Sequence, residues 1–199
     1  MESIVLASGN KGKIAEFAAM FAACGVQTIP IKELLPAWRV EETGSTLHEN
    51  ALIKARAAVE ATGRAALADD SGLFVYYLGG EPGVYSQCYA GADATDEENN
   101  ALLLQKLARA GDRRQAHFAA VLTLMRPNGT HIAATGRLFG RITDAPRGTS
   151  GFGYDPLFQV RGRGLTLAEL PLPEKNAISH RALAWQVMRD ALGLSSYAQ

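Results

Sequence analysis

The stretch that decides the fold is residues 3–25, which read SIVLASGNKGKIAEFAAMFAACG. Its first part, residues 3–7, is a run of aliphatic and β-branched side chains, which is typical of a buried strand. Residues 8–10 (Ser-Gly-Asn) predict a tight turn. Apolar side chains then recur at helical spacing over residues 14–21, and Gly25 is a typical helix stop. A strand, a turn and a helix in this order favour an α/β protein.

The rest of the chain continues with strand and helix patterns. Further strands are predicted from apolar and β-branched runs over residues 26–30, 65–68, 73–78, 118–125 and 131–138. Helical spacing predicts helices over residues 46–62, 95–110 and 179–192. Capping boxes open two of these helices, at Thr46-x-x-Glu49 and Thr95-x-x-Glu98, and Asn128-Gly129 predicts a hairpin turn. Residues 32–43 and the glycine-rich residues 148–153 predict loops. The pattern indicates an α/β or α+β fold on a mixed sheet.

Composition narrows the functional classes. The 199 residues are 47% hydrophobic, and 20 Lys and Arg balance 20 Asp and Glu. A chain of this length can bury a substantial core as one domain, residues 1–199, or as two lobes around a cleft. The balanced charge argues against steering onto nucleic acid or an anionic membrane. Cys24 and Cys88 do not form a disulfide framework, and no apolar run is long enough to span a membrane. We therefore expect a soluble, cytoplasmic protein.

The first candidate for chemistry is the turn between the first strand and the first helix. It comprises Ser8, Gly9, Asn10, Lys11, Gly12 and Lys13. Unpaired backbone N–H groups and the helix dipole favour an anion at such a helix start, so a phosphate fits here. The spacing is not that of a Walker loop, because only two residues separate Gly9 from Gly12 and Ile14 follows Lys13. An ordinary polar turn that caps a helix is the alternative.

The second candidate is a set of four acids, Glu41, Glu42, Asp69 and Asp70. Glu41 and Glu42 lie in a predicted loop, where solvated surface is the alternative interpretation. Asp69 and Asp70 follow an apolar run, so at least one of them is expected at the carboxyl end of a strand, where α/β sheets bind ligands. Neighbouring strand residues point to opposite faces, so only one of the two is expected to face the site directly. Carboxylates of this kind suit Mg²⁺.

Two further candidates lie in the last third of the chain. Gly151-Phe152-Gly153-Tyr154-Asp155-Pro156 presents an aromatic ring between glycines, on which a base can stack, although a loop anchored to the core is the alternative. Lys175, Ser179, His180 and Arg181 form a basic cluster at a predicted helix start, and a capped helix with exposed basic residues is the alternative. Taken together, an anion-binding turn, acids, an aromatic platform and basic groups are the parts that a nucleoside triphosphate requires.

The same residues carry a resemblance to a known family. Six blocks occur in order, and they are SGNKGK (8–13), EETGSTLHENALIKA (41–55), ADDSGL (68–73), GGEPGVYS (79–86), SGFGYDP (150–156) and EKNAISHR (174–181). They closely resemble the inosine triphosphate pyrophosphatase family, and the match spans nearly the whole chain. The resemblance implies a two-lobed α/β homodimer with a long twisted mixed sheet, flanking helices and a central nucleotide-binding cleft. It also implies Mg²⁺-dependent hydrolysis of ITP, dITP and XTP to the monophosphate and pyrophosphate.

The resemblance also implies roles for residues. Asp70 is expected to be the proton acceptor, and Glu41 and Asp70 are expected to bind the metal. The expected substrate contacts are Ser8, Gly9, Asn10, Lys11, Gly12, Lys13, Ser71, Phe152, Gly153, Tyr154, Asp155, Lys175, His180 and Arg181. One departure is Cys88, which stands where bacterial relatives commonly have arginine. Residue patterns leave open whether Lys54 faces the site or solvent, and they assign no role to Asp69.

The mechanism that fits is attack by water on the α-phosphorus, with Asp70 as the base. Donors from His180 or Arg181 can satisfy a 6-oxo purine but would meet the 6-amino group of adenine donor to donor. The rival enzyme is a Maf-type pyrophosphatase that acts on pyrimidine or modified nucleotides. A rival of another class is a non-catalytic nucleotide-binding or nucleic-acid-binding module, which the missing basic stripe disfavours.

Overall fold

The protein is described by a computed structural model that covers residues 3–194, and it divides into two compact units. The first unit comprises the residues up to Asp70, then Ala120–Gly136, and the chain from Arg181 onward. The second unit comprises Ser71–Ala119 and Arg137–His180. The strands are β1 (Ile4–Leu6), β2 (Thr28–Pro30), β3 (Ala66–Val75), β4 (Gln115–Met125), β5 (His131–Ile142) and β6 (Phe158–Val160). The helices are α1 (Lys11–Ala22), α2 (Ile31–Leu34), α3 (Leu47–Thr62), α4 (Asp96–Lys106), α5 (Leu172–Ile178) and α6 (His180–Ala191).

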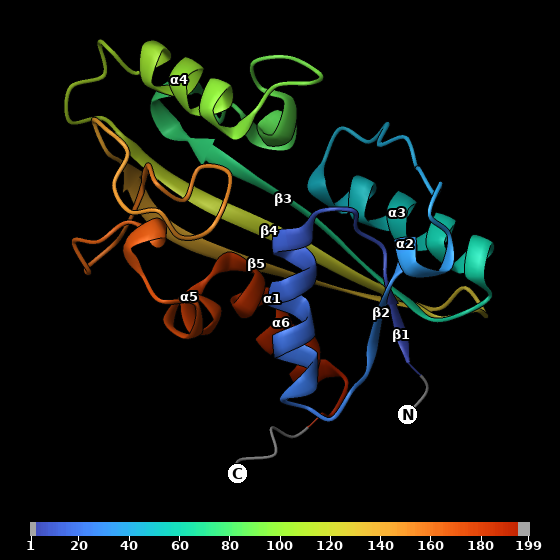
Figure 1. The fold of residues 1–199 in the computed structure, drawn as a ribbon. Coiled ribbons are helices and arrows are strands. Elements are labelled where there is room, and N and C mark those ends of the chain that lie inside the picture. The colour runs from blue at the N-terminus through green and yellow to red at the C-terminus, as the bar shows by residue number, and fades with distance from the viewer. Residues whose placement is uncertain (1–2, 195–199) are drawn as a thin grey trace. The chain divides into compact units, whose positions relative to one another are not determined.

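The six strands are hydrogen-bonded in the order β2-β1-β3-β4-β5-β6 (Figure 1). β1 pairs in parallel with β2 and β3, whereas β5 and β6 are antiparallel. The sheet is therefore mixed, and helices flank it, which confirms the α/β class. Strands β3, β4 and β5 contribute residues to both units. Among residues 3–194, no helix is long and apolar enough to cross a membrane.

In the first unit, the strand pleat sends alternate side chains to two apolar layers. Leu6 and Leu67 pack against Phe17 and Phe21 of α1 and Trp185 of α6 on one face. Val5, Ala7, Ala66 and Ala68 point to the other face, where α3 and Ile31 of α2 cover them. Figure 1 shows α1 and α6 side by side on one face, and α3 on the other. Even-numbered and odd-numbered residues of β3 therefore meet different helices.

In the second unit, the core lies on one face of the sheet. Leu73 and Val75 of β3, Phe118 of β4 and Phe158 of β6 pack with Leu103 and Leu107, at the end of α4. Rings on the opposite face are more exposed and stack on each other, with Phe74 and His117 at 5.0 Å between centroids. Tyr76 and Phe139 flank His117 at 5.5 and 5.6 Å.

Some predicted boundaries were wrong. The two strands predicted over residues 65–68 and 73–78 are one strand, because β3 continues from Ala66 to Val75, and Tyr76–Leu78 forms a single 3₁₀ turn. The predicted loop over residues 32–43 begins inside the short helix α2, and the short helix α5 was missed. β4 and β5 are also longer than the predicted hairpin strands. The two capping boxes, at Thr46 and Thr95, are confirmed.

Candidate active site

The turn after β1 presents backbone donors to an anion. Ser8 Oγ accepts the Asn10 N–H at 3.2 Å, and Asn10 Oδ1 caps α1 by accepting the Lys13 N–H at 3.0 Å. The backbone N–H groups of Gly9, Lys11 and Gly12 donate to no acceptor within residues 3–194. Three unsatisfied N–H groups beside the positive end of a 12-residue helix form a suitable environment for a phosphate.

Asp69 and Asp70 are adjacent on β3 and contact different cations. Asp69 shares its face with Leu67, and its Oδ2 lies 2.7 Å from Lys13 Nζ of α1 and 3.4 Å from Arg181 Nε of α6. Asp70 points to the face of α3, and its Oδ1 accepts a hydrogen bond from Lys54 Nζ at 2.8 Å. Both carboxylates are buried. The strand pleat therefore separates two acids that are neighbours in sequence.

Asp69 belongs to a buried charge network. The guanidinium of Arg181 also contacts Glu16 Oε2 of α1, through Nη1 at 3.1 Å. Burial by itself would raise the pKa of Asp69, but the positive charges of Lys13 and Arg181 outweigh burial and hold that pKa well below its usual range. Burial lowers the pKa of Lys13, and Asp69 opposes this effect. Asp69 is thus a carboxylate that holds two cations, a role that the sequence left unassigned.

Asp70 lies in a different electrostatic environment. Burial raises the pKa of its carboxyl to about 6, although the charges of Lys54 and Lys13 oppose the rise. Burial also disfavours the charged form of Lys54, but Asp70 and Glu42 outweigh it, so the pKa of Lys54 is raised. Lys54 Nζ bridges Asp70 and Glu42, at 2.8 and 2.9 Å. The structure therefore turns Lys54 toward the acids and away from solvent.

The acids of the first unit fit Mg²⁺ by their chemistry. Asp70 Oδ2 is buried and accepts no hydrogen bond from the described part of the chain, so one hard oxygen is available. Glu41 is exposed, and its neighbour Glu42 is the residue that reaches Lys54. Within residues 3–194, no group of three His, Cys, Asp or Glu side chains could hold a metal ion. This arrangement suits Mg²⁺, which takes one or two carboxylates and completes its shell with phosphate oxygens and water.

The glycine-rich segment of the second unit forms an ordered loop around Phe152. Asp155 Oδ2 accepts the Phe152 N–H at 3.1 Å and lies 2.6 Å from Lys175 Nζ of α5. The Lys175 ammonium lies 4.8 Å from the centre of the Phe152 ring. Gly151 has φ +83°, and a Cβ at this position would clash with the Asp155 carboxylate. The loop therefore requires glycine at residue 151, and it presents an aromatic ring with a cation above it.

Two residues of α4 clamp this loop, and sequence reasoning missed them. Asp96 Oδ2 accepts the Gly153 N–H at 2.6 Å, and Asn100 Nδ2 donates to the Gly153 carbonyl at 2.9 Å. Both backbone groups of one loop residue are thus held from the first turns of a helix. Their i, i+4 spacing on α4 places Asp96 and Asn100 on one side of the helix, which is the only signal that the sequence offers.

The remaining predicted residues have identifiable surroundings. His180 is buried, and its ring stacks on Phe118 at 4.7 Å with an interplanar angle of 11°. The Tyr154 hydroxyl donates to the Ser86 carbonyl at 2.9 Å, and burial raises the pKa of this hydroxyl. Ser71 is half-buried and is the first residue of the second unit. His180 and Arg181 are adjacent, but the boundary between the units lies between them.

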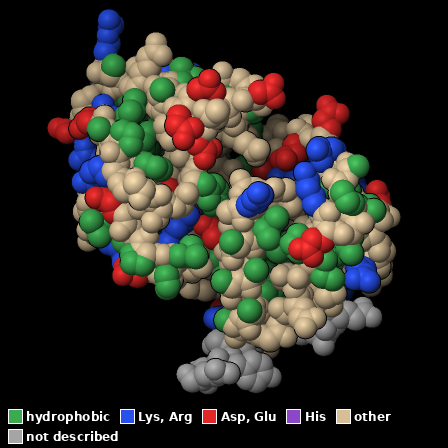
Figure 2. Space-filling model, in the orientation of Figure 1, with side chains coloured by type: hydrophobic (Ala, Val, Ile, Leu, Met, Phe, Trp, Pro, Cys, Tyr) green, Lys and Arg blue, Asp and Glu red, His purple; other side chains and the backbone are tan. Residues whose placement is uncertain are grey.

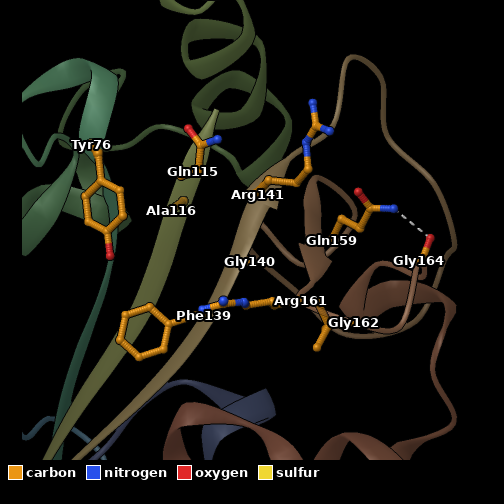
Figure 3. A pocket seen from close by; sticks show the side chains of 11 residues that line it. Tyr76, Gln115, Ala116, Phe139, Gly140, Arg141, Gln159, Arg161, Gly162 and Gly164 are labelled. Atoms are coloured by element: carbon orange, nitrogen blue, oxygen red, sulfur yellow. Dashed lines mark hydrogen bonds between the residues drawn. The ribbon is translucent and has the colours of Figure 1, made fainter. Parts of the chain in front are cut away.

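A pocket of the second unit contains none of the predicted site residues. Its volume is about 570 Å³, and Figure 3 shows the rings of Tyr76 and Phe139 at one end and Arg141 and Gln159 at the other. Tyr76 is 53% exposed and Phe139 is 46% exposed. This pocket lies on the open face of the sheet, and its lining combines these two rings with the polar side chains of Gln115, Arg141, Gln159 and Arg161. Cys88, the departure from the family pattern, is exposed with a free thiol.

The comparisons with known proteins agree with this chemistry. The Ham1 family model matches residues 4–191. A dITP/XTP pyrophosphatase of Geobacter sulfurreducens is 47% identical over 194 residues, which cover 97% of this chain and 98% of the relative. The dITP/XTP pyrophosphatase of Escherichia coli O157:H7 is also 47% identical, over 96% of this chain and 98% of its own. Neither supports a Maf-type activity.

Solved structures give the same result. A HAM1 protein from Coxiella burnetii superimposes with a TM-score of 0.87 at 44% identity, over 98% of this chain and 100% of its own. A nucleoside-triphosphatase, also named dITP/XTP pyrophosphatase, from Mycobacterium abscessus has a TM-score of 0.76 at 41% identity, over 94% and 98% of the two chains. Sequence and structure agree over nearly the whole length, and the chain belongs to the Ham1 family.

Proposed function

We propose that the protein hydrolyses non-standard purine nucleoside triphosphates, namely dITP, XTP and ITP, to the monophosphate and pyrophosphate. Such a reaction removes deaminated purines from the nucleotide pool. The observation that carries the proposal is the buried carboxylate of Asp70, which has one oxygen available and lies beside the Lys54 ammonium. The activity named for relatives that are 47% identical over nearly their full length supports the same reaction.

Asp70 is the proposed general base. Its pKa of about 6 leaves it ionised at neutral pH yet basic enough to accept a proton from the attacking water. Lys54 donates to the other oxygen of the same carboxylate, so it fixes the orientation of Asp70. Asp70 and Glu41 are the proposed ligands of Mg²⁺, which when bound supplies charge neutralisation on the polyphosphate.

The turn of residues 8–13 is the proposed phosphate site. The N–H groups of Gly9, Lys11 and Gly12 are oriented by the Asn10 cap, so they donate to phosphate oxygens without reorganisation. Lys13 is held by Asp69 at 2.7 Å, and it adds a positive charge whose position is fixed. These contacts are alike for every nucleoside triphosphate, so the turn of residues 8–13 does not select the base.

Base selection is assigned to Phe152 and His180 of the second unit and to Arg181 of the first. Phe152 is the proposed stacking platform, because the Asp155 and Lys175 contacts hold its loop. Stacking is tolerant of base identity and contributes about 1–3 kcal/mol. His180 is the proposed donor to the 6-oxo group, with its ring orientation fixed by Phe118. Arg181 is the second proposed donor, although its guanidinium contacts Glu16 and Asp69 in the first unit.

We further propose a homodimer in which the open sheet face with Tyr76 and Phe139 packs against a second copy. Exposed aromatic side chains that stack in one cluster are typical of interfaces, and the family resemblance implies a dimer. We place the enzyme in the cytoplasm, because the nucleoside triphosphates it would hydrolyse are cytoplasmic metabolites. Figure 2 shows positive and negative side chains interspersed over the visible face, which supports a small-molecule substrate over nucleic acid.

The experiment is a panel of dITP, XTP, ITP, GTP, ATP, dTTP and UTP with Mg²⁺, in which released pyrophosphate is measured. The expected result is a kcat/KM for dITP, XTP and ITP that exceeds the others by orders of magnitude. Asp70→Asn should lower turnover by roughly 10²–10⁴-fold, whereas Asp93→Asn, at an exposed position, should not. Preference for dTTP or UTP, or an active Asp70→Asn variant, contradicts the proposal.

A further inference from the structure

Lys32 lies outside the six blocks that the family resemblance rests on, yet its side chain reaches the phosphate turn. Lys32 is the second residue of α2, which begins directly after β2. β2 pairs in parallel with β1, with Leu6 opposite Pro30. The carboxyl ends of the two strands therefore meet at one edge of the sheet, and the turn of residues 8–13 and α2 both begin there.

The Lys32 side chain lies against Gly9. A Cβ placed on Gly9 would lie 3.0 Å from Lys32 Cε and 3.3 Å from Lys32 Nζ. The end of the lysine side chain therefore lies close to Gly9, and a side chain at position 9 would require it to shift. Ile31, the preceding residue, is fully buried and anchors α2. Lys32 itself is half-buried, so its stem is packed while its ammonium stays beside the free N–H of Gly9.

The charge balance of the first unit gives Lys32 a distinct role. Three cations, the half-buried Lys13 and the buried Lys54 and Arg181, contact four carboxylates of Glu16, Glu42, Asp69 and Asp70. The network that holds the proposed base and its lysines thus carries no positive charge in excess. Lys32, in contrast, has no carboxylate within 4.0 Å among residues 3–194. Its charge is available to an external anion.

We propose that Lys32 is a further substrate-binding residue that contacts the polyphosphate of the nucleotide. This inference rests on the proposed function, because it names an additional contact at the phosphate turn. Lys32 adds to the phosphate turn a positive charge that no carboxylate of residues 3–194 neutralises, whereas the charge of Lys13 is paired with Asp69. Because it binds phosphate and not the base, Lys32 strengthens the binding of every nucleoside triphosphate to the same degree.

The test compares Lys32→Met, Lys32→Arg and the matched control Lys106→Met. Lys106 is an exposed lysine paired with Glu81 in the second unit, so its replacement makes the same chemical change far from the turn in sequence. Removing a charged hydrogen-bond donor from an anion costs about tenfold or more in affinity. For Lys32→Met we expect the KM for dITP to rise about tenfold, while kcat changes less than about threefold. Lys32→Arg should recover most of the loss, and Lys106→Met should match wild type.

A binding measurement with inorganic tripolyphosphate and Mg²⁺ separates this inference from the proposed function. Lys32→Met should bind tripolyphosphate about tenfold more weakly than wild type, and this gap should narrow as ionic strength rises. Equal tripolyphosphate affinity in Lys32→Met and wild type overturns the role of Lys32, even if wild type hydrolyses dITP. A failure of Lys32→Arg to recover affinity also overturns it. A wild-type protein that binds tripolyphosphate but releases no pyrophosphate from dITP contradicts the proposed function alone.

Discussion

Asp69 and Asp70 are neighbours on one strand, but their carboxyl groups have opposite pKa shifts. Lys13 and Arg181 hold the pKa of Asp69 low, so this carboxylate is a permanent counter-ion. Asp70 meets one buried lysine and keeps one oxygen available, and burial raises its pKa to about 6. The difference arises from the pleat, which turns odd-numbered residues of β3 toward α1 and α6 and even-numbered residues toward α3. The surroundings of Asp70 therefore suit proton transfer, whereas Asp69 holds Lys13 and Arg181 in place.

The pKa of Asp70 predicts a pH-dependent stability in the metal-free protein. An unfolded aspartate has a pKa of about 3.9, so protonation favours the folded state. The stability contributed by Asp70 is fully present below about pH 4 and is lost as pH rises through about 6. Between pH 4 and pH 7, wild type should thus lose on the order of 2–3 kcal/mol relative to Asp70→Asn.

Urea unfolding in EDTA at both pH values measures this difference. The comparison with the variant cancels the contribution of the other carboxyl groups. A stability gap between wild type and Asp70→Asn that is equal at pH 4 and pH 7 would show that the pKa of Asp70 is not raised.

Arg181 is expected to contribute to stability through the two carboxylates that it contacts. Arg181→Met removes the guanidinium next to Glu16 and Asp69, which are both buried, and should cost about 3–5 kcal/mol. Glu16→Gln in the same background should restore part of this loss, because it removes one buried negative charge. A double-mutant cycle on the free energy of unfolding measures the coupling, and strictly additive effects would contradict it. For a test of base selection, Arg181→Lys is the better variant because it keeps the charge.

The loop of residues 148–155 depends on backbone geometry that side-chain patterns only partly reveal. Its glycines and Phe152 predicted an aromatic platform, and the loop is present. The clamp from Asp96 and Asn100 was not predictable, because the two residues are more than 50 positions away in sequence and read as an ordinary helix start. The continuous strand β3 was missed for a related reason. Asp-Asp-Ser-Gly is a turn sequence by propensity, and pairing within the sheet overrides that propensity.

The glycine at position 151 gives the sharpest test of this loop. Gly151→Ala places a methyl group against the Asp155 carboxylate at φ +83°, so the loop must shift and the hydrogen bond to Phe152 is lost. We expect the KM to rise at least about tenfold for dITP and XTP alike. Gly162→Ala is the matched control, because it has φ +79° with no atom near the added Cβ. If both variants show the same KM, backbone strain at positive φ alone explains the rise in KM, and the contact between residue 151 and Asp155 does not position the loop.

Patterns that are local in sequence predicted the α/β class and five of the six strands, β1 to β5. They did not predict the pairing of Lys54 with Asp70, because helix periodicity allowed either orientation and only the packing of α3 on β3 decides between them. The ion pairs of Asp69 and Asp70 lie in the first unit and the Lys175–Asp155 pair lies in the second, and this division required the three-dimensional structure.

The homodimer proposed to form through the open sheet face with Tyr76 and Phe139 can be tested by mutation. Phe139→Glu introduces a charge into the cluster of Tyr76, His117 and Phe139, where it would be buried against a second copy. If the proposed homodimer forms through this face, we expect the variant to run as a monomer in light scattering at concentrations at which wild type runs as a dimer. Tyr85→Glu is the control at another exposed aromatic, 67% accessible and absent from this cluster. Dimers of equal stability in wild type and Phe139→Glu would place the interface elsewhere.

In the proposed mechanism, water activated by Asp70 attacks the α-phosphorus. Hydrolysis of dITP in ¹⁸O-labelled water, followed by mass spectrometry of both products, shows which phosphorus the water attacks. The account predicts one ¹⁸O atom in the deoxyinosine monophosphate and unlabelled pyrophosphate, with the same products formed at a rate lower by roughly 10²–10⁴-fold in Asp70→Asn. Label in the pyrophosphate would place the attack on the β-phosphorus, and deoxyinosine diphosphate with labelled or unlabelled phosphate would place cleavage at the terminal bond. Either result would contradict the account.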